Sequence, residues 1–131
     1  MSCAINSARR CRTPFGNNIA GTLPDAQLEG MANKIDVKNE NIIQTSFADN
    51  NFDLITSNLC LHNIYDKQLR IKACKGIYMI LKPGDKVIIS DFKHNAEYKE
   101  VFEGLGMQTE KKTTCFFSTY PPLTVIVAKK N

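Results

Sequence analysis

The sequence lacks the cysteine spacings that build metal or redox sites. Its five cysteines include no C-x-x-C pair; they are Cys3, Cys11, Cys60, Cys74 and Cys115. An odd, scattered set does not form a closed disulfide framework, and reduced thiols in a cytoplasmic protein are the simplest interpretation. Cys60 and His62 lie close in sequence, but a transition-metal site needs about four ligands and no partner cluster is visible. We therefore expect no metal site.

The sequence also lacks a long apolar run. None approaches the roughly 20 residues that a membrane-spanning helix needs, so no span is predicted. Residues 1–15 contain arginine and serine but no acidic residue, and no apolar segment of the kind that a secretory signal requires. A transit peptide is one interpretation of this segment; we favour a disordered or unrelated leader. Residues 16–131 then form a single domain.

The excess of positive charge is small. Lysine and arginine number 17 against 13 aspartate and glutamate, which gives a formal net charge of +4. No run of basic residues alternates with aromatic ones, so the sequence does not predict nucleic-acid binding, and a solvated basic face accounts for the charge. With 43% hydrophobic and 23% charged residues, the composition is that of a soluble globular protein.

The centre of the chain predicts one strand–helix–strand unit. Phe52–Asn58 is a short apolar run after a cluster of Asn and Asp, as in a buried strand. Apolar residues recur at helical spacing over Asp66–Leu81, with Asp66 as N-cap, and Pro83-Gly84 should end this helix. Lys86–Ser90 is the second strand. Because a helix connects them, the two strands should lie parallel, as in half of a doubly wound α/β domain.

Weaker patterns flank this unit. Before it, Asp25–Met31 is weakly helical, and Lys34–Gln44 alternates loosely, which predicts a strand with a kink. After it, Ala96–Leu105 has the apolar spacing of a helix. Two further strands are predicted, Met107–Phe117 and Leu123–Ala128. A short turn joins them, so they should form an antiparallel hairpin, and the second, apolar throughout, should be central.

Several motifs in this order resemble the class I S-adenosylmethionine-dependent methyltransferases. They are Phe52-Asp53 at the start of a strand, His62-Asn63-Ile64 after it, and Leu81-Lys82-Pro83-Gly84 before the next strand. The antiparallel hairpin at the end is also typical of that family. The resemblance covers the chain from about Gly16 onwards. It implies a partial Rossmann-like α/β sheet of mixed direction, with S-adenosyl-L-methionine as the cofactor.

The cofactor motifs of this family are largely missing. Its first strand, and the glycine-rich turn through which the backbone approaches the cofactor, have no counterpart before the region of resemblance. The family's acidic residue near the end of the third strand corresponds to Asn41, an amide. Without a first strand, the fourth strand at Asp53–Asn58 should have an open apolar edge, which favours self-association. We expect Lys34–Gln44 to fill that place, to pair with another copy or to fray.

The candidate binding residues lie where the predicted parallel strands end, the edge at which open α/β sheets bind ligands. Asn41, Ser57 and Asn58 are the cofactor-side candidates. The alternative is that the polar pair Ser57 and Asn58 makes only local hydrogen bonds. His62 and Asn63 would lie on the substrate side.

His62 and Asp91 are the catalytic candidates. His62 could accept a proton near neutral pH, or it could simply pack against the start of the next helix. Asp91, which would end the fifth strand of the family, could contact a substrate or cap the following loop. The resemblance implies methyl transfer to a small-molecule or protein acceptor that the sequence does not identify, and the missing motifs lead us to expect impaired activity. The alternative is a non-catalytic methyltransferase-fold remnant that self-associates or binds a partner.

Overall fold

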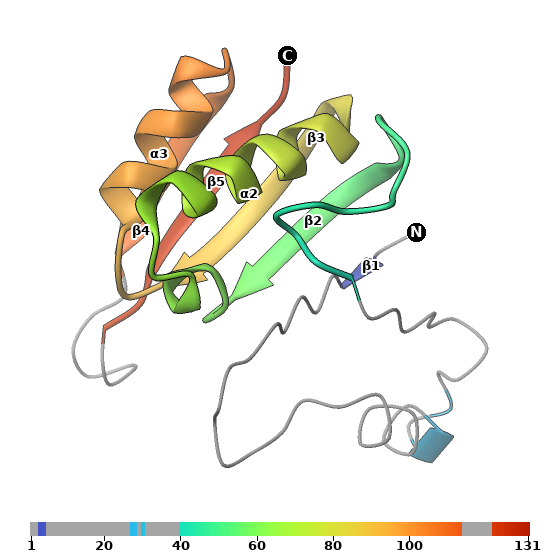
Figure 1. The fold of residues 1–131 in the computed structure, drawn as a ribbon, viewed down its shortest axis with the longest axis horizontal. Coiled ribbons are helices and arrows are strands. Elements are labelled where there is room, and N and C mark those ends of the chain that lie inside the picture. The colour runs from blue at the N-terminus through green and yellow to red at the C-terminus, as the bar shows by residue number, and fades with distance from the viewer. Residues whose placement is uncertain (1–2, 5–26, 29, 31–39, 114–121) are drawn as a thin grey trace.

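In the part of the chain that the structure describes, the fold is built on a five-stranded mixed sheet. The computed structural model describes residues 3–4, 27–28, 30, 40–113 and 122–131. The sheet order is β1-β2-β3-β5-β4 (Figure 1). β1 to β3 run parallel, whereas β5 is antiparallel to both of its neighbours. The strands are β1 (Cys3–Ala4), β2 (Phe52–Asn58), β3 (Leu81–Asp91), β4 (Gln108–Thr113) and β5 (Thr124–Lys129). The predicted mixed α/β sheet is thereby confirmed. The last two strands pair in antiparallel fashion, as predicted, and the last strand lies inside the sheet and not at its edge.

Two helices of the described segment 40–113 cover one face of this sheet (Figure 1). They are α2 (Lys67–Ile80) and α3 (Asn95–Gly104), and the short 3-10 helix η2 (Leu61–Asn63) leads from β2 to α2. Along β3 the buried side chains alternate, which turns Val87, Ile89 and Asp91 towards the helices. The core lies between the two layers, and each fully buried aliphatic or aromatic side chain contributes about 1.5–3 kcal/mol. Its members include Ile55, Ala73, Cys74, Ile77, Ile80, Leu81, Tyr98, Phe102, Ile126 and Ala128.

Helix α2 begins as its sequence predicts. The Asp66 side chain accepts a hydrogen bond from the backbone N–H of Leu69 at 2.9 Å, which satisfies one of the free N–H groups of the first turn. The apolar spacing places Ala73, Cys74 and Ile77 on the buried face of the helix. Burial of the Cys74 thiol raises its pKa to about 12, so this cysteine stays a neutral core residue.

The end of α2 differs from the prediction. The helix stops at Ile80 and β3 begins directly at Leu81, so Pro83 and Gly84 lie inside the strand and not in a turn. The strand tolerates them because its pairing with β2 is irregular between Phe52 and Leu54. Gly84 has a φ of 85°, a left-handed conformation that glycine adopts without steric cost.

A buried lysine contacts the C-terminal end of α2, where the helix has no basic residue in its own last turn. The Nζ of Lys130 donates to the carbonyl oxygens of Tyr78 at 2.8 Å and Leu81 at 2.7 Å, and to the Asn50 side chain at 3.0 Å. It also lies 4.3 Å from the centre of the Tyr78 ring. Carbonyl groups at a helix C-terminus carry partial negative charge, so this ammonium group stabilises the helix end.

Helix α3 also follows its sequence pattern. Tyr98 and Phe102 are fully buried, and burial raises the pKa of the Tyr98 hydroxyl. After the helix, Gly106 adopts a φ of 84° and its N–H donates to the Glu103 carbonyl at 2.9 Å. A left-handed glycine just past the end is a common way to close a helix.

The strand predicted over Lys34–Gln44 is wrong for the residues that the structure describes, 40–44. These form a turn in which the Asn41 side chain accepts from the N–H of Ile43 at 3.1 Å, and the N–H of Gln44 donates to the Asn41 carbonyl at 2.9 Å. A side chain that bonds its own backbone two residues on competes with strand pairing. Residues 34–39 lie outside the described part of the chain.

The outer edge of β2 is paired by a different segment from the one expected. Cys3 and Ala4 of β1 lie beside Ile55 and Thr56 in parallel register. These two residues belong to the segment predicted as a leader, and they occupy part of the place that a first strand would fill. Among the described strands, β1 covers only these two positions of the edge.

Other predictions fall partly outside the described residues. Residues 27 and 28 are helical and Gly30 has a φ of 67°, as expected near a helix end, but the rest of Asp25–Met31 is not described. Likewise, β4 follows the predicted strand only as far as Thr113, because residues 114–121 lie outside the description. No helix among the described residues has both the length and the apolar character to cross a bilayer.

Candidate functional site at the ends of β2 and β3

The candidate site lies at the carboxyl ends of the parallel strands β2 and β3. Ser57 pairs with Ile89 and Asn58 with Ser90, so the two strands end together. The chain then turns at Leu59, which has a positive φ of 50°, and its N–H donates to the Ser90 carbonyl at 2.9 Å. This turn sends η2 across the end of the sheet. The predicted substrate-side and catalytic residues are thereby brought to one edge.

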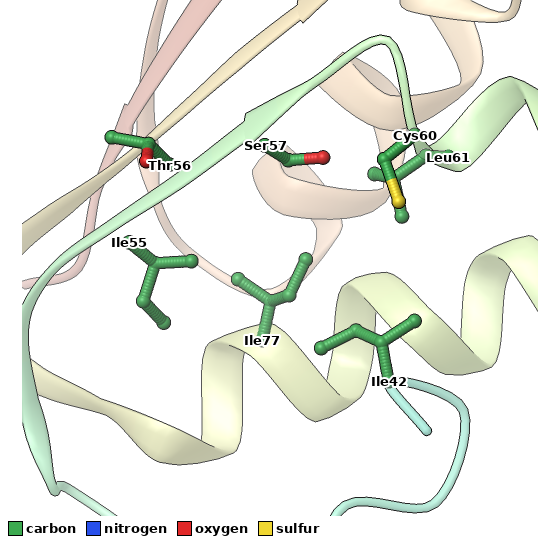
Figure 2. A pocket seen from close by; sticks show the side chains of 7 residues that line it. All are labelled: Ile42, Ile55, Thr56, Ser57, Cys60, Leu61 and Ile77. Atoms are coloured by element: carbon green, nitrogen blue, oxygen red, sulfur yellow. The ribbon is translucent and has the colours of Figure 1, made fainter. Parts of the chain in front are cut away.

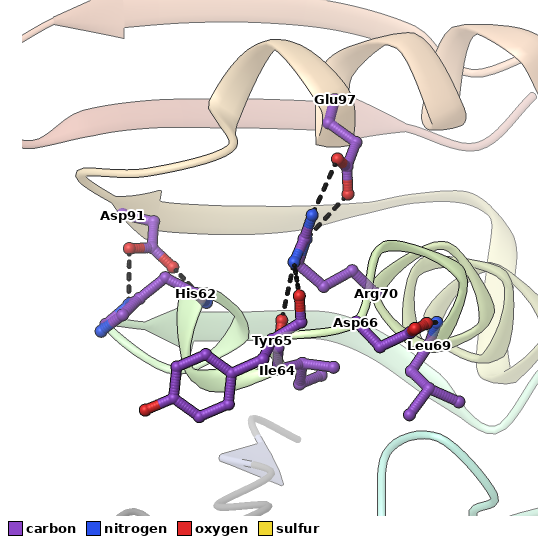
Figure 3. A network of polar contacts seen from close by, with 8 residues as sticks. All are labelled: His62, Ile64, Tyr65, Asp66, Leu69, Arg70, Asp91 and Glu97. Atoms are coloured by element: carbon purple, nitrogen blue, oxygen red, sulfur yellow. Dashed lines mark hydrogen bonds and ion pairs between the residues drawn. The ribbon is translucent and has the colours of Figure 1, made fainter.

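Asp91 joins the end of β3 to η2. Its side chain is fully buried, and its two oxygens accept hydrogen bonds from backbone N–H groups, Phe92 at 2.8 Å and His62 at 3.2 Å. The Nδ1 of His62 lies 2.8 Å from Asp91 Oδ1, without the alignment of a regular hydrogen bond (Figure 3). Asp91 thus caps the following loop, as one of the two interpretations held, and it is also the carboxylate partner of His62. Its contact with a substrate stays a prediction.

His62 is held on its other side by an aromatic ring. The imidazole and the Phe92 ring have centroids 4.5 Å apart and are tilted by 52°. The His62 side chain is 16% exposed, so one part of the ring reaches the surface. Asn63, its neighbour, turns its amide back to the carbonyl oxygens of Leu59 and Cys60, both at 3.3 Å. In this structure Asn63 therefore supports the loop.

A shallow hollow opens beside the end of β2. It is small and open to solvent. Figure 2 shows side chains from three segments around it. Its lining is mostly apolar, with Ser57 and Thr56 as hydroxyl groups and Cys60 as a thiol; the other lining residues are Ile42, Ile55, Leu61 and Ile77.

The three cofactor-side candidates are placed differently around this hollow. Ser57 lines it. Asn58 is exposed and does not line it, and Asn41 uses its side-chain oxygen in the turn described above. Ile42, the residue after Asn41, is the one that lines the hollow from this loop. Gly76 of α2 permits this close packing, because a Cβ there would lie 3.0 Å from the Ile42 carbonyl oxygen.

Sequence reasoning missed the residue that fixes the far end of the η2 loop. Arg70 of α2 is 5% exposed, and one terminal nitrogen donates to the carbonyl oxygens of Ile64 and Tyr65, both at 2.8 Å. Its Nε and other terminal nitrogen donate to the two carboxylate oxygens of Glu97 in α3, at 2.8 and 3.1 Å (Figure 3). The sequence did contain a signal for this residue. Arg70 lies on the apolar face of an amphipathic helix, and a buried charge there needs hydrogen-bonding or charged partners.

The donor set of the hollow fits S-adenosylmethionine in part. Apolar walls suit an adenine ring, and the Ser57 hydroxyl is a hydrogen-bonding group. Among the residues lining the hollow, none is a carboxylate of the kind that holds ribose hydroxyls. The chain's Gly-x-Gly, Gly104-Leu105-Gly106, starts at the last residue of α3, and α3 ends at the opposite end of the sheet from the carboxyl ends of β2 and β3 (Figure 1). No group of three or more potential metal ligands occurs within the described residues.

Comparison with known families gives one match that covers most of the chain. Residues 8–89 match the model of the family described as "Methyltransferase domain". This range includes η2, α2 and most of β3. It therefore covers the three motifs on which the resemblance to class I methyltransferases rests.

Curated relatives include ubiquinone/menaquinone biosynthesis C-methyltransferases named UbiE. The protein from Pseudoalteromonas translucida is 40% identical over 63 residues, which cover 48% of this chain and 24% of the relative. The protein from Klebsiella pneumoniae (strain 342) is 30% identical over 100 residues, which cover 76% of this chain and 36% of the relative. The chain thus corresponds to about a quarter to a third of the length of these relatives.

Solved structures with the same fold include enzymes of different chemistry. The [4+2]-cyclase SpnF has a TM-score of 0.70 at 12% identity and covers 86% of this chain and 62% of its own. A phosphoethanolamine N-methyltransferase from Haemonchus contortus, solved with phosphomonomethylethanolamine and S-adenosylhomocysteine, has a TM-score of 0.68 at 17% identity. That alignment covers 86% of this chain and 41% of the other. At these identities the likeness shows a shared fold.

Proposed function

Because the chain belongs to the methyltransferase domain family, we propose that it acts as an S-adenosylmethionine-dependent methyltransferase. One observation supports this proposal most: the hollow at Ser57 and the His62–Asp91 pair lie at the same edge of the sheet. Ser57 and the apolar wall would hold the cofactor, which supplies an electrophilic methyl group. The acceptor, a small molecule or a protein, would approach on the side of His62 and Asn63.

We also propose that cofactor binding is weaker than in relatives that have a glycine-rich turn and an acidic residue for the ribose. Asn41 supports this, because it is an amide and its oxygen is already used in a turn. Methyl transfer depends strongly on positioning, so a cofactor held by fewer contacts should react more slowly. Impaired activity of this chain is thus part of the proposal.

Calorimetric titration of S-adenosylmethionine and S-adenosylhomocysteine into the purified chain tests the proposal. Ser57→Leu, which fills the hollow, should abolish the heat of binding. Ser90→Leu is the matched control, because Ser90 lies in the neighbouring strand between two residues that face the helices and therefore faces the other side. Micromolar binding that Ser57→Leu removes supports the proposal. A folded chain that gives no heat at high ligand concentration overturns it.

The second candidate function is a non-catalytic module that self-associates. The short pairing of β1 favours it, since β1 covers only Ile55 and Thr56 of the outer edge of β2 among the described strands. Exposed strand edges pair readily with other chains. Sedimentation equilibrium should then show a dimer that Thr56→Lys weakens, because a lysine on an edge opposes pairing. A monomer at all concentrations contradicts this alternative.

A further inference from the structure

The sheet face opposite α2 and α3 has a pattern of charge that methyl transfer does not use. We propose that this face binds a short, acidic amphipathic helix of a partner protein. Figure 1 shows α2 and α3 on the same side of the sheet. Sheets with parallel strands, such as β1 to β3, normally carry helices on both faces. The proposal needs no cofactor, so it stands or fails independently of the proposed function.

Strand register defines which side chains share this face. Side chains alternate along a strand, and Val87 and Ile89 are turned towards the helices, so Lys86, Ile88 and Ser90 point to the opposite face. Pairing with the neighbouring strands gives three rows: Leu54, Lys86, Lys129 and Gln108; Thr56, Ile88, Val127 and Glu110; Asn58, Ser90, Val125 and Lys112. None of these side chains is buried.

The aliphatic residues of the three rows form a diagonal stripe. The stripe runs from Leu54 through Ile88 and Val127 to Val125. Its ends lie two strands and two rows apart, which corresponds to about 16 Å at about 4.8 Å per strand and about 6.6 Å per row. An α-helix of about 11 residues spans this length. The stripe therefore matches three turns of a helix with one apolar side.

Lys86 and Lys129 make this face attractive to carboxylates. They lie directly opposite each other on the antiparallel strands β3 and β5, an arrangement in which like charges destabilise a sheet. Both side chains are exposed, and neither forms an ion pair with a described residue. Lys112 adds a third ammonium group to the face, against one carboxylate, that of Glu110. Acidic residues of a partner placed over the lysine pair would relieve its repulsion.

The charge and composition of the face argue against other occupants. Two copies packed through this face would bring two positively charged surfaces together. Single-stranded nucleic acid stacks its bases on aromatic rings, and the three rows contain none. The chain's segments outside the described residues hold more basic than acidic side chains, namely Arg9, Arg10, Arg12, Lys34 and Lys38 against Asp25, Glu29 and Asp36. An acidic helix from another protein complements the face better than any of these.

Two labelled synthetic peptides test the proposal by fluorescence anisotropy. Both are amphipathic helices of about 14 residues with leucine at i, i+3, i+4 and i+7, and they differ only in having glutamate or lysine beside the leucines. The wild-type chain should bind the glutamate peptide with a Kd of about 10 μM and the lysine peptide about 10-fold more weakly. Added salt should reduce this difference. Equal binding of the two peptides, or no binding of either, overturns the proposal.

Charge reversal locates the binding surface. Lys86→Glu combined with Lys129→Glu should weaken binding of the glutamate peptide about 10-fold and strengthen binding of the lysine peptide. The matched control is Lys72→Glu combined with Lys75→Glu, because these lysines are exposed on α2 and the change in net charge is the same. The control should keep the wild-type preference. Equal effects of the two double variants overturn the proposal.

A measurement on the wild-type chain decides the question even if a variant does not fold. In methyl NMR spectra the glutamate peptide should shift the signals of Ile88, Val125 and Val127. Leu69 and Met79, which are 41% and 48% exposed on the helical layer, should keep theirs. Shifts at Leu69 and Met79 alone overturn the proposal. So does a dimer that forms through Ile88 and Val127, or a uridine oligonucleotide that shifts the same signals at lower concentration than the peptide.

Discussion

Arg70 and Glu97 form a two-point ion pair that joins α2 to α3, with Nε 2.8 Å from one carboxylate oxygen and a terminal nitrogen 3.1 Å from the other. The same guanidinium donates to two carbonyl groups at the end of the η2 loop. One side chain therefore connects both helices to the loop that presents His62. Its planar shape allows this, because five N–H groups point in fixed directions.

Removing this guanidinium should destabilise the domain. Arg70→Met leaves Glu97 and two carbonyl groups without their partner, and we expect a loss of about 3 kcal/mol in the free energy of unfolding. Urea denaturation measures it. Arg70→Met combined with Glu97→Met should recover part of the loss, because no unpaired charge is left. A double variant that is no more stable than Arg70→Met contradicts this account.

The same pair should appear in the pH dependence of stability. Its hydrogen bonds from Arg70 lower the pKa of Glu97 below its ordinary value of 4.5. The folded pKa is thus below the unfolded one, so the stabilisation is complete above pH 4.5 and is lost as the pH falls through the folded pKa. Thermal denaturation in acid should show a shallower decline for Glu97→Gln than for wild type below pH 4.5. Parallel declines would exclude this contribution.

Lys130 should contribute more to the free energy of unfolding than Lys129. Lys130→Met removes a cation from the carbonyl groups of Tyr78 and Leu81 at the end of α2, and we expect a loss of about 2 kcal/mol. Lys129→Met, at an exposed position of β5, should change stability little. Chemical denaturation of both variants makes the comparison. Equal effects would show that the contacts of Lys130 are not stabilising.

Two helical glycines should respond differently to alanine. Gly104→Ala should stabilise the domain by about 0.5–1 kcal/mol, because alanine favours helix and nothing lies within 4 Å of the new Cβ. Gly76→Ala should lose this gain, because its Cβ would lie 3.0 Å from the Ile42 carbonyl oxygen. Melting temperatures measure both effects. A similar rise for both variants would mean that the loop at Ile42 moves away freely.

The elements that sequence patterns predict well are those specified by local signals. The Asp66 cap, the apolar spacing of α2 and α3 and the continuous apolar strands β2, β3 and β5 depend on neighbouring residues. The strand predicted over Lys34–Gln44 was wrong at Asn41 because the apolar residues alternate loosely there, as they do in a strand. The hydrogen bond from the Ile43 N–H to the Asn41 side chain, which forms the turn, does not alter that alternation.

The site was predicted in part for the same reason. Ser57, His62 and Asp91 could be placed at one sheet edge because parallel strands end together. Arg70 could not be paired from sequence, since Glu97 lies 27 positions away on another helix. The contacts of Lys130 were even harder to predict, because Asn50 and Tyr78 lie 80 and 52 positions away in the sequence. Such contacts depend on how the layers pack, and not on any local pattern.

The position of β5 between β3 and β4 has a consequence for folding during synthesis. β4 precedes β5 in the chain, yet among the described strands β4 joins the sheet only through β5. While the ribosome is still making β5, β3 and β4 each lack the one described strand that pairs with them on that side. Unpaired strand edges on partly folded chains are sites of aggregation. The nascent domain is therefore most vulnerable in the interval before Thr124–Lys129 inserts.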